Sequence, residues 1–366
     1  MTCNRSRITH RVPVLAIAGL LALLPFSLSA ETGRDIQSHE VRLSTPDPEV
    51  TLAGTLRLPD SARNGIVVLM ITGSGDHKRD AIISGTPLFR LKAEALAAAG
   101  IASLRLDDRG TGESTGPSTR ASTTADRVVD MRAALDWLRA GELAEFSRVG
   151  VIGHSEGAGI GARLAAQTNP PDFLILLGTP ALQGKEVWVD QQVAGFRQSV
   201  GIEAPEILAQ VEAHMREAAR LSIAGAAPEA MQENTIALFA LGGIDVNAEE
   251  NNHMLEGFTS RMADRWMRHF LADNPAQALA ATRVPVLAIY GSHDRLTSAA
   301  ANAGPLVEAL VTAGNPDFTV QIMPDQDHFF LRAPGRPVGE HAFGEMELPT
   351  EVMSTVIAWL RRNPGP

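Results

Sequence analysis

A short apolar run leads directly into the pattern Gly-x-Ser-x-Gly within residues 148–158, and a helix-forming sequence follows it. The β-branched run at residues 149–152 favours a buried strand, and residues 157–167 favour a tightly packed helix. In such a nucleophile elbow a serine is held at a strained strand-to-helix corner, where a Cβ on either flanking glycine would collide with the backbone. The segment therefore predicts Ser155 as a candidate nucleophile.

The beginning of the sequence has the features of a secretory signal peptide. Three arginines precede an apolar stretch over residues 12–28, and two small residues end it. We expect a signal peptide over residues 1–30, cleaved near Ala30, and a periplasmic or secreted protein with no stable membrane insertion after cleavage. A membrane anchor is the alternative, but the stretch is short for a span of about 20 residues and contains Pro13 and Pro25.

Cysteine content and charge exclude several classes of function. Cys3 is the only cysteine and would leave with the signal peptide, which excludes disulfides, a catalytic cysteine and thiolate metal sites from the mature chain. Loss of three arginines and no acids would change the formal net charge from −10 to −13. This acidic balance, with no cluster of Lys and Arg, argues against nucleic acid as a partner. It leaves the oligomeric state open.

Strand patterns alternate with helical patterns along most of the chain. Residues 39–45 and 50–58 predict an opening antiparallel pair. Apolar runs predict further strands at 65–72, 101–106, 173–177, 284–290 and 318–323, besides the strand before the elbow. Helical spacing predicts helices at 87–99, 123–141 and 350–361. This alternation predicts an α/β fold with a mostly parallel sheet covered by helices on both faces.

One long interval contains helical patterns but no convincing strand. Within residues 181–283, the segments 205–221 and 257–271 have helical spacing. We expect this interval to form a helical lid, inserted into a core of residues 31–180 and 284–366. The alternative is a helical elaboration packed away from the functional site. Apolar lid side chains expected to line a pocket are Trp188, Met215, Met254, Met262, Trp266 and Met267.

Two strand ends after the lid offer the acid and the base that a serine nucleophile requires. A serine hydroxyl is too weakly acidic to attack a carbonyl unaided, so a base must accept its proton and an acid must orient the base. Asp294 follows the expected strand 284–290, and His328 follows the strand 318–323. Both therefore lie at the edge of the sheet where sites of parallel sheets form. Alternatives are Asp325 and Asp327 as the acid, and His154, His293 and His341 as the base.

Two backbone N–H groups are candidates for binding the oxyanion of a tetrahedral intermediate. The first belongs to Glu156, directly after the nucleophile. The second belongs to Ser74, in the glycine-containing loop 72–76 after the first parallel strand. A plain tight turn is the alternative for that loop. The Glu156 carboxylate itself is explained as an acid in the first turn of a helix.

At these residues the chain resembles the α/β-hydrolase superfamily, and more narrowly bacterial carboxylesterases of the serine-aminopeptidase-like branch. The resemblance rests on Gly73-Ser74-Gly75 followed by Arg79-Asp80, on the stretch Asp-Asp-Arg-Gly-Thr-Gly-Glu-Ser at residues 107–114, and on Gly-His-Ser-Glu-Gly at the elbow. It implies an α/β-hydrolase fold over about residues 52–360, with a structural turn at Asp108 and Arg109 beside the site. The alternative is that these two residues contact the substrate.

Together, the expected signal peptide and the three residues Ser155, Asp294 and His328 predict an exported serine hydrolase that cleaves carboxylic esters with short to medium acyl chains through an acyl-enzyme on Ser155, without a metal or an organic cofactor. One alternative keeps the same three residues but cleaves aminoacyl amides or transfers acyl groups. A second is a non-catalytic binding module on a hydrolase scaffold. For the first alternative, the lid acids that could recognise a peptide amine are Glu203, Glu206 and Glu212.

Overall fold

The computed structural model describes residues 35–62, 65–201, 203–246, 248, 251–332 and 350–362. The expected signal peptide and the alternative base His341 lie outside these residues. Among the described residues, no helix has the length and apolar character needed to cross a membrane. The same residues contain no group of three or more His, Cys, Asp or Glu side chains placed to hold a metal ion.

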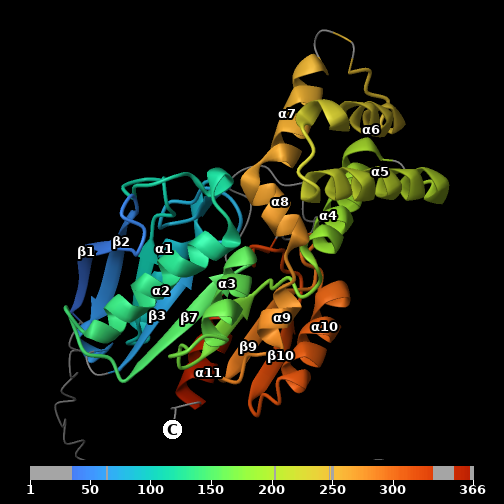
Figure 1. Cartoon of the computed structure of the whole chain (residues 1–366). Coiled ribbons are helices and arrows are strands. Elements are labelled where there is room, and N and C mark those ends of the chain that lie inside the picture. The colour runs from blue at the N-terminus through green and yellow to red at the C-terminus, as the bar shows by residue number, and fades with distance from the viewer. Residues whose placement is uncertain are drawn as a thin grey trace, which may run out of the picture. The chain divides into compact units, whose positions relative to one another are not determined.

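The described residues form a mixed eight-stranded sheet in the order β1-β2-β6-β3-β7-β8-β9-β10 (Figure 1). The pair β1–β2 is antiparallel, as expected for the opening pair. The pair β2–β6 is also antiparallel, and every other neighbouring pair is parallel. This confirms the predicted α/β fold with a mostly parallel sheet. The strands are β1 (Ile36–Ser44), β2 (Thr51–Pro59), β3 (Ile66–Ile71), β6 (Ala102–Leu106), β7 (Arg148–His154), β8 (Leu174–Leu177), β9 (Val286–Gly291) and β10 (Phe318–Met323).

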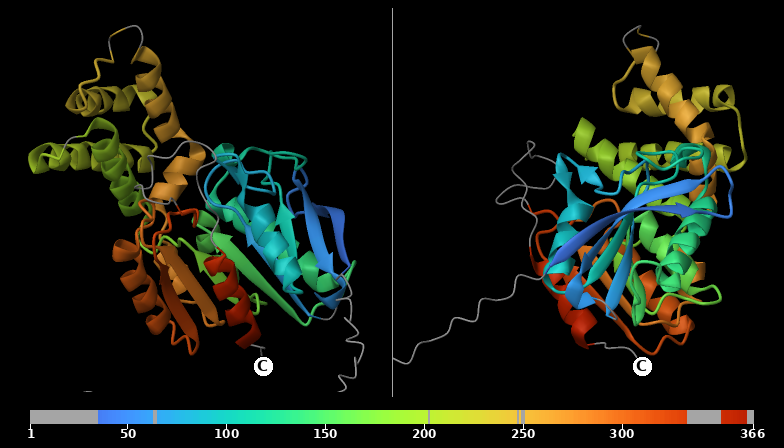
Figure 2. Two further views of the ribbon diagram at one scale, coloured as in Figure 1. Left: turned by 180° about the vertical axis from the view of Figure 1, so that it is seen from behind. Right: turned by 90° about the vertical axis from the view of Figure 1, so that its left-hand side faces the viewer.

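Helices cover both faces of the sheet because the central strands are apolar on both sides. Val68 and Met70 pack in one buried cluster with α1 and α11, whereas Val67 and Leu69 pack in a second cluster with α2, α3 and α10. Figure 2 (left), seen from behind, shows α11 in front of the sheet, on the side opposite the one that faces the reader in Figure 1. The core helices are α1 (Leu88–Ala98), α2 (Thr124–Ala140), α3 (Glu156–Ala165), α9 (Pro275–Leu279), α10 (Ala299–Thr312) and α11 (Glu351–Arg362).

The lid consists of α4 to α8 and has a buried cluster of its own. That cluster includes Val211, Met231 and Leu271, each with 1 % or less of its surface exposed. The short helix α9 also lies within residues 181–283, but it packs against α3 and α10 of the core. The lid helices are α4 (Gly184–Val200), α5 (Pro205–Ile223), α6 (Pro228–Leu241), α7 (Asn252–Ala263) and α8 (Arg265–Ala272).

A small hairpin before α1 was not expected from the sequence. It joins β4 (Ile82–Ile83) to β5 (Thr86–Pro87) through Ser84 and Gly85, both of which have a positive φ, as a two-residue hairpin turn requires. Two-residue strands are too short to produce a periodic pattern. Single turns of 3₁₀-helix complete the described elements, as η1 (Asp60–Ala62) and η2 (Thr119–Ala121).

The corner between β7 and α3 has the close packing that the Gly-x-Ser-x-Gly pattern predicts. A Cβ on Gly153 would lie 2.3 Å from the carbonyl oxygen of Gly157, and a Cβ on Gly157 would lie 2.4 Å from the carbonyl oxygens of Ile71 and Thr72. Ser155, between these glycines, has φ 55° and ψ −122°, a strained conformation for a residue with a side chain. The neighbouring backbone therefore fixes where the Ser155 side chain stands.

Gly157→Ala is expected to lower the free energy of unfolding by about 1–3 kcal/mol, because the added methyl group would overlap two carbonyl oxygens that belong to the backbone. Gly195→Ala is the matched control, since nothing lies within 4 Å of a Cβ at that position in α4. Alanine favours a helix over glycine, so the control should be neutral or slightly stabilising. Urea unfolding curves of the two variants test this, and equal curves would contradict the packing argument.

Candidate active site

Ser155 and His328 line one cavity of about 600 Å³ at the ends of the parallel strands. Ser155 follows β7 directly, and its backbone N–H donates to the carbonyl of Leu177, the last residue of the neighbouring strand β8, at 2.8 Å. His328 lies in the loop after β10. Chain segments 173 residues apart in the sequence thus meet here, because the carboxyl ends of β7 and β10 share one edge of the sheet.

Asp294 lies in the loop after β9 and binds His328 directly. His328 Nδ1 donates to Asp294 Oδ2 at 2.9 Å, and the N–H groups of Leu296 and Thr297 donate to Asp294 Oδ1, each at 2.8 Å. Burial alone would raise the pKa of Asp294, but these hydrogen bonds and the charge of His328 outweigh it and lower the pKa below its usual value. A carboxylate at Nδ1 keeps the proton on that nitrogen and leaves Nε2 as an acceptor, as a general base requires.

Thr297 and Gly178 also contact this pair, and the sequence did not single them out. Thr297 Oγ1 lies 2.9 Å from Asp294 Oδ2, 2.9 Å from the carbonyl oxygen of Gly178 and 3.1 Å from His328 Nδ1. Gly178 has φ 57°, and a Cβ there would come within 3.1 Å of the His328 ring and 3.3 Å of the Asp294 carboxylate. The end of β8 therefore needs glycine so that the acid and the base can approach each other.

His154, one of the alternative bases, has a positioning role. Its Nε2 donates to the backbone carbonyl of His328 at 2.8 Å, and the two rings lie 4.7 Å apart between centroids. Burial, followed by the nearby charge of His328, lowers the pKa of His154 well below its usual value, which keeps the ring neutral. A neutral ring that holds the backbone of His328 helps to fix the position of this candidate base.

The remaining alternatives for acid and base do not form a similar pair. Asp327 is buried, and its Oδ1 accepts the N–H groups of Phe329 and Leu331, which shapes the loop that carries His328. Asp325 and His293 are exposed, and neither lines the cavity. Among the described carboxylates, only that of Asp294 is hydrogen-bonded to His328.

The two candidate oxyanion donors belong to residues that line the cavity with Ser155. Glu156 is the first residue of α3, so its N–H has no carbonyl partner within the helix. Ser74 follows Gly73, at which a Cβ would lie 3.1 Å from the Ser155 Cβ. Glycine at position 73 thus allows the loop after β3, which carries the candidate donor Ser74, to approach Ser155 closely.

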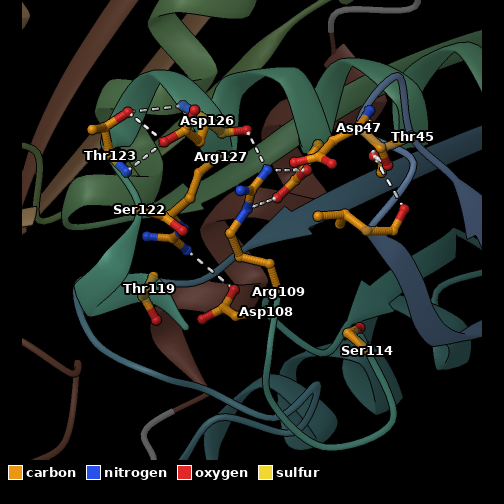
Figure 3. A network of polar contacts seen from close by, with 12 residues as sticks. Thr45, Asp47, Asp108, Arg109, Ser114, Thr119, Ser122, Thr123, Asp126 and Arg127 are labelled. Atoms are coloured by element: carbon orange, nitrogen blue, oxygen red, sulfur yellow. Dashed lines mark hydrogen bonds and ion pairs between the residues drawn. The ribbon is translucent and has the colours of Figure 1, made fainter. Parts of the chain in front are cut away.

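Arg127 of α2 connects this loop to the elbow. Its guanidinium donates to the carbonyl oxygens of Thr72 (3.1 Å) and Gly73 (2.9 Å), and to Thr72 Oγ1 (2.9 Å). It also donates to the carboxylates of Asp108 (3.2 Å) and Glu156 (3.3 Å), and Figure 3 shows the Arg127 side chain directed at Asp108. Arg127 is 2 % exposed. One buried side chain therefore holds both segments that carry the candidate oxyanion donors.

Asp108 and Arg109 form a structural turn, as the resemblance implied. Asp108 accepts hydrogen bonds from Thr72 Oγ1 at 2.8 Å and from the N–H of His77 at 3.0 Å, and neither Asp108 nor Arg109 lines the cavity. Arg109 binds both carboxylate oxygens of Asp130, at 2.7 and 2.8 Å. The motif therefore fixes the position of the loop after β3, and neither Asp108 nor Arg109 reaches the cavity.

The Glu156 carboxylate does more than favour the start of a helix. It is 4 % exposed and accepts a hydrogen bond from Thr124 Oγ1 at 2.6 Å, in addition to the contact with Arg127. Trp266 of α8 donates its Nε1–H to the same carboxylate at 3.3 Å. Glu156 thus joins the elbow, the core helix α2 and the lid.

The lid forms one wall of the cavity. Of the six apolar side chains expected there, Trp188, Met262, Trp266 and Met267 line the cavity, whereas Met215 and Met254 do not. Met215 packs inside the lid cluster instead, because it lies on the face of α5 that meets the other lid helices. The full set of lining residues from the lid is Val187, Trp188, Gln191, Gln192, Phe258, Arg261, Met262, Trp266, Met267 and Phe270.

The three lid acids considered for amine recognition are absent from the described cavity wall. Glu203 pairs with Arg197 at 3.2 Å, and Glu212 pairs with Arg216 at 2.9 Å. Glu206 is exposed in the first turn of α5. Glu206 and Glu212 thus belong to the solvated face of α5, and Glu203 to the exposed connection between α4 and α5.

Comparisons with known proteins agree on the family and the fold. The serine aminopeptidase S33 family (Hydrolase_4) matches residues 88–334. The esterase Pf2001 of Pyrococcus furiosus is 18% identical with a TM-score of 0.56, covering 90% of this chain and 92% of its own. A proline iminopeptidase of Mycobacterium smegmatis is 18% identical with a TM-score of 0.53, and the match covers 89% of this chain and 99% of the iminopeptidase. Est1E of Butyrivibrio proteoclasticus, solved with ferulic acid bound, is 15% identical with a TM-score of 0.51, and the match covers 88% of this chain and 98% of Est1E. At such identities the likeness shows the fold alone; no curated protein matches the sequence.

Ser155→Ala and His328→Ala are each expected to lower kcat on an activated ester by about 10⁴- to 10⁶-fold while the protein stays folded. Asp294→Asn should also lose most of kcat, because an amide at this place favours the wrong tautomer of the His328 ring. Steady-state kinetics with circular dichroism as the folding control measure this. A His328→Ala variant that kept more than about a tenth of kcat would show that the base is wrongly assigned.

Arg127→Lys is expected to lower kcat by about 10²- to 10³-fold with little change in KM, because the ammonium group cannot reach all acceptors of the guanidinium and the oxyanion donors lose their position. Arg90→Lys, on the exposed side of α1, is the matched control: it makes the same substitution outside the buried network and should leave kcat unchanged. A fall in unfolding temperature without a fall in kcat would assign Arg127 to stability alone.

Proposed function

The chain belongs to the serine aminopeptidase S33 family, and from this premise we propose that it is an exported serine esterase acting on small carboxylic esters with short to medium acyl chains. The observation that carries the proposal is the meeting of Ser155 with the Asp294–His328 pair at one cavity. A nucleophile, an oriented base and a site for an oxyanion at one place are the requirements of acyl transfer.

The proposed reaction proceeds in two steps through an acyl-enzyme. His328 Nε2 accepts the hydroxyl proton of Ser155 as Oγ attacks the ester carbonyl, and the N–H groups of Ser74 and Glu156 bind the oxyanion. The alcohol leaves with the proton held by His328, which yields the acyl-enzyme. Water then attacks the acyl carbon, gives its proton to His328, and the carboxylic acid leaves as Ser155 recovers its proton. Asp294 holds the His328 ring and stabilises its cationic form.

The charges around the cavity support esters rather than aminoacyl amides. A free α-amine is a cation, so its recognition needs an available carboxylate. Glu156 is the only acidic residue among the described lining residues, and its carboxylate is already bound by Thr124, Arg127 and Trp266. A non-catalytic binding module would not need the strained backbone of Ser155 or the hydrogen bond that orients His328, so both features favour an enzyme.

The size of the cavity supports short to medium acyl chains. A volume of about 600 Å³ lies within the usual range for small-molecule sites, about 300–1,000 Å³. The lid side chains that close one wall are largely apolar. Such a pocket suits a dissolved substrate rather than an interface with lipid.

A panel of dissolved esters and aminoacyl amides tests this function on the chain that begins near Glu31. Saturable hydrolysis of dissolved C2 to C8 esters is expected, with amides at least about 100-fold slower in kcat/KM and no rise in rate beyond the solubility limit. A fluorophosphonate probe should label wild type and spare Ser155→Ala. Faster turnover of amides, or a marked rise on emulsified long-chain esters, would contradict the proposal. N-terminal sequencing of the protein recovered outside the cytoplasm tests the export.

A further inference from the structure

A buried lysine lines the same cavity, and the proposed reaction does not use it. Lys92 lies on α1, between Phe89 and Leu96 on the side of the helix that faces the core, and is only 3 % exposed. Its neighbours along the cavity wall include His154 and His328. A lysine on an otherwise apolar helix face is rare, because burying its ammonium group is costly unless a partner compensates it.

The ammonium group of Lys92 has no such partner in the described part of the chain. No hydrogen bond or ion pair joins its Nζ atom to any described residue, whereas nearby Arg79 and Arg105 have carboxylate partners in Asp107 and Asp80. Burial lowers the pKa of Lys92 to about 8, although the charge of Asp327 acts in the opposite direction. Lys92 therefore stays largely protonated at pH 7, and its ammonium group lines the cavity without a direct hydrogen bond or ion pair to any described residue.

We propose that Lys92 binds a carboxylate group of the substrate, so that the natural substrates are esters that carry a free carboxylate besides the ester bond. This inference rests on the proposed esterase function and names its substrate class. A single ammonium group matches the single negative charge of a carboxylate, whereas a phosphate monoester carries up to two charges at neutral pH. No acidic residue that lines the described cavity is free to compete for Lys92, since Glu156 is already bound.

Paired substrates of equal length test the inference. 4-Nitrophenyl hydrogen adipate is compared with 4-nitrophenyl hexanoate, and 4-carboxyphenyl butyrate with 4-carbamoylphenyl butyrate, so that the carboxylate is placed once on the acyl part and once on the alcohol part. Wild type should favour the anionic member of at least one pair in kcat/KM. Lys92→Met should lower that preference by about 10- to 100-fold, the usual effect of losing a hydrogen bond to a charged group.

Lys185→Met is the matched control, because it makes the same substitution at a residue outside the described cavity wall and should keep the wild-type preference. Equal preference in Lys92→Met and wild type, or no preference of wild type in either pair, would overturn the inference. Failure of wild type to hydrolyse any of the four esters or to react with the fluorophosphonate would instead overturn the esterase function.

The wild-type protein gives a second measurement that does not depend on the folding of a variant. The ratio of kcat/KM for the anionic and neutral esters should fall between pH 7 and pH 9, because Lys92 loses its proton near pH 8. The other titratable or charged groups at the cavity are His77, His154, Glu156, Arg261 and His328, with Asp327 close to Lys92. Their effects on the reaction at the ester bond are common to both members of a pair and cancel in the ratio. A ratio that stays constant over this range would contradict the role of Lys92.

Discussion

The edge of the sheet that carries the candidate site depends on the buried guanidinium of Arg127. Removing such a cation from water costs several kcal/mol unless paired charges and hydrogen bonds compensate it. Here the compensation comes from the carbonyls of Thr72 and Gly73 and from the carboxylates of Asp108 and Glu156. Any displacement of the loop after β3 or of the elbow would leave this cation poorly bound. The requirement to satisfy Arg127 therefore holds in place the two segments that carry the candidate oxyanion donors.

The same network extends to the lid through one carboxylate. Glu156 accepts hydrogen bonds from Thr124 on α2 and from Trp266 on α8, and it also contacts Arg127. Trp266 lines the cavity as well. A lid movement that withdrew Trp266 would remove a donor from a carboxylate located directly after the nucleophile. The position of the lid and the electrostatics at the start of α3 are thus physically linked.

The sequence predicted those features that have a local physical cause. Continuous apolar runs gave the central strands, and the glycines at 153 and 157 gave the elbow, because each pattern follows from steric or burial constraints within a few residues. Asp294 and His328 were found because parallel strands end at a common edge. Their catalytic roles stay predictions. Thr297 was not predicted because a threonine three residues after a candidate acid has no distinctive pattern. Met215 was misplaced because the cavity and the lid cluster both contain apolar side chains.

Arg127 and Lys92 are two buried cations whose different roles cannot be predicted from the sequence pattern alone. Both interrupt the apolar stripe of a core helix, Arg127 on α2 and Lys92 on α1, and the two helices belong to opposite faces of the sheet. The stripe alone marks each as an unusual buried cation without telling the two apart. Their acceptors make the distinction: Arg127 is surrounded by carbonyls and carboxylates, whereas the described residues offer Lys92 none within hydrogen-bonding distance. A buried cation whose hydrogen bonds are all made by the protein fixes the positions of the segments around it. A buried cation without a direct partner, lining a cavity, is instead available to bind a ligand.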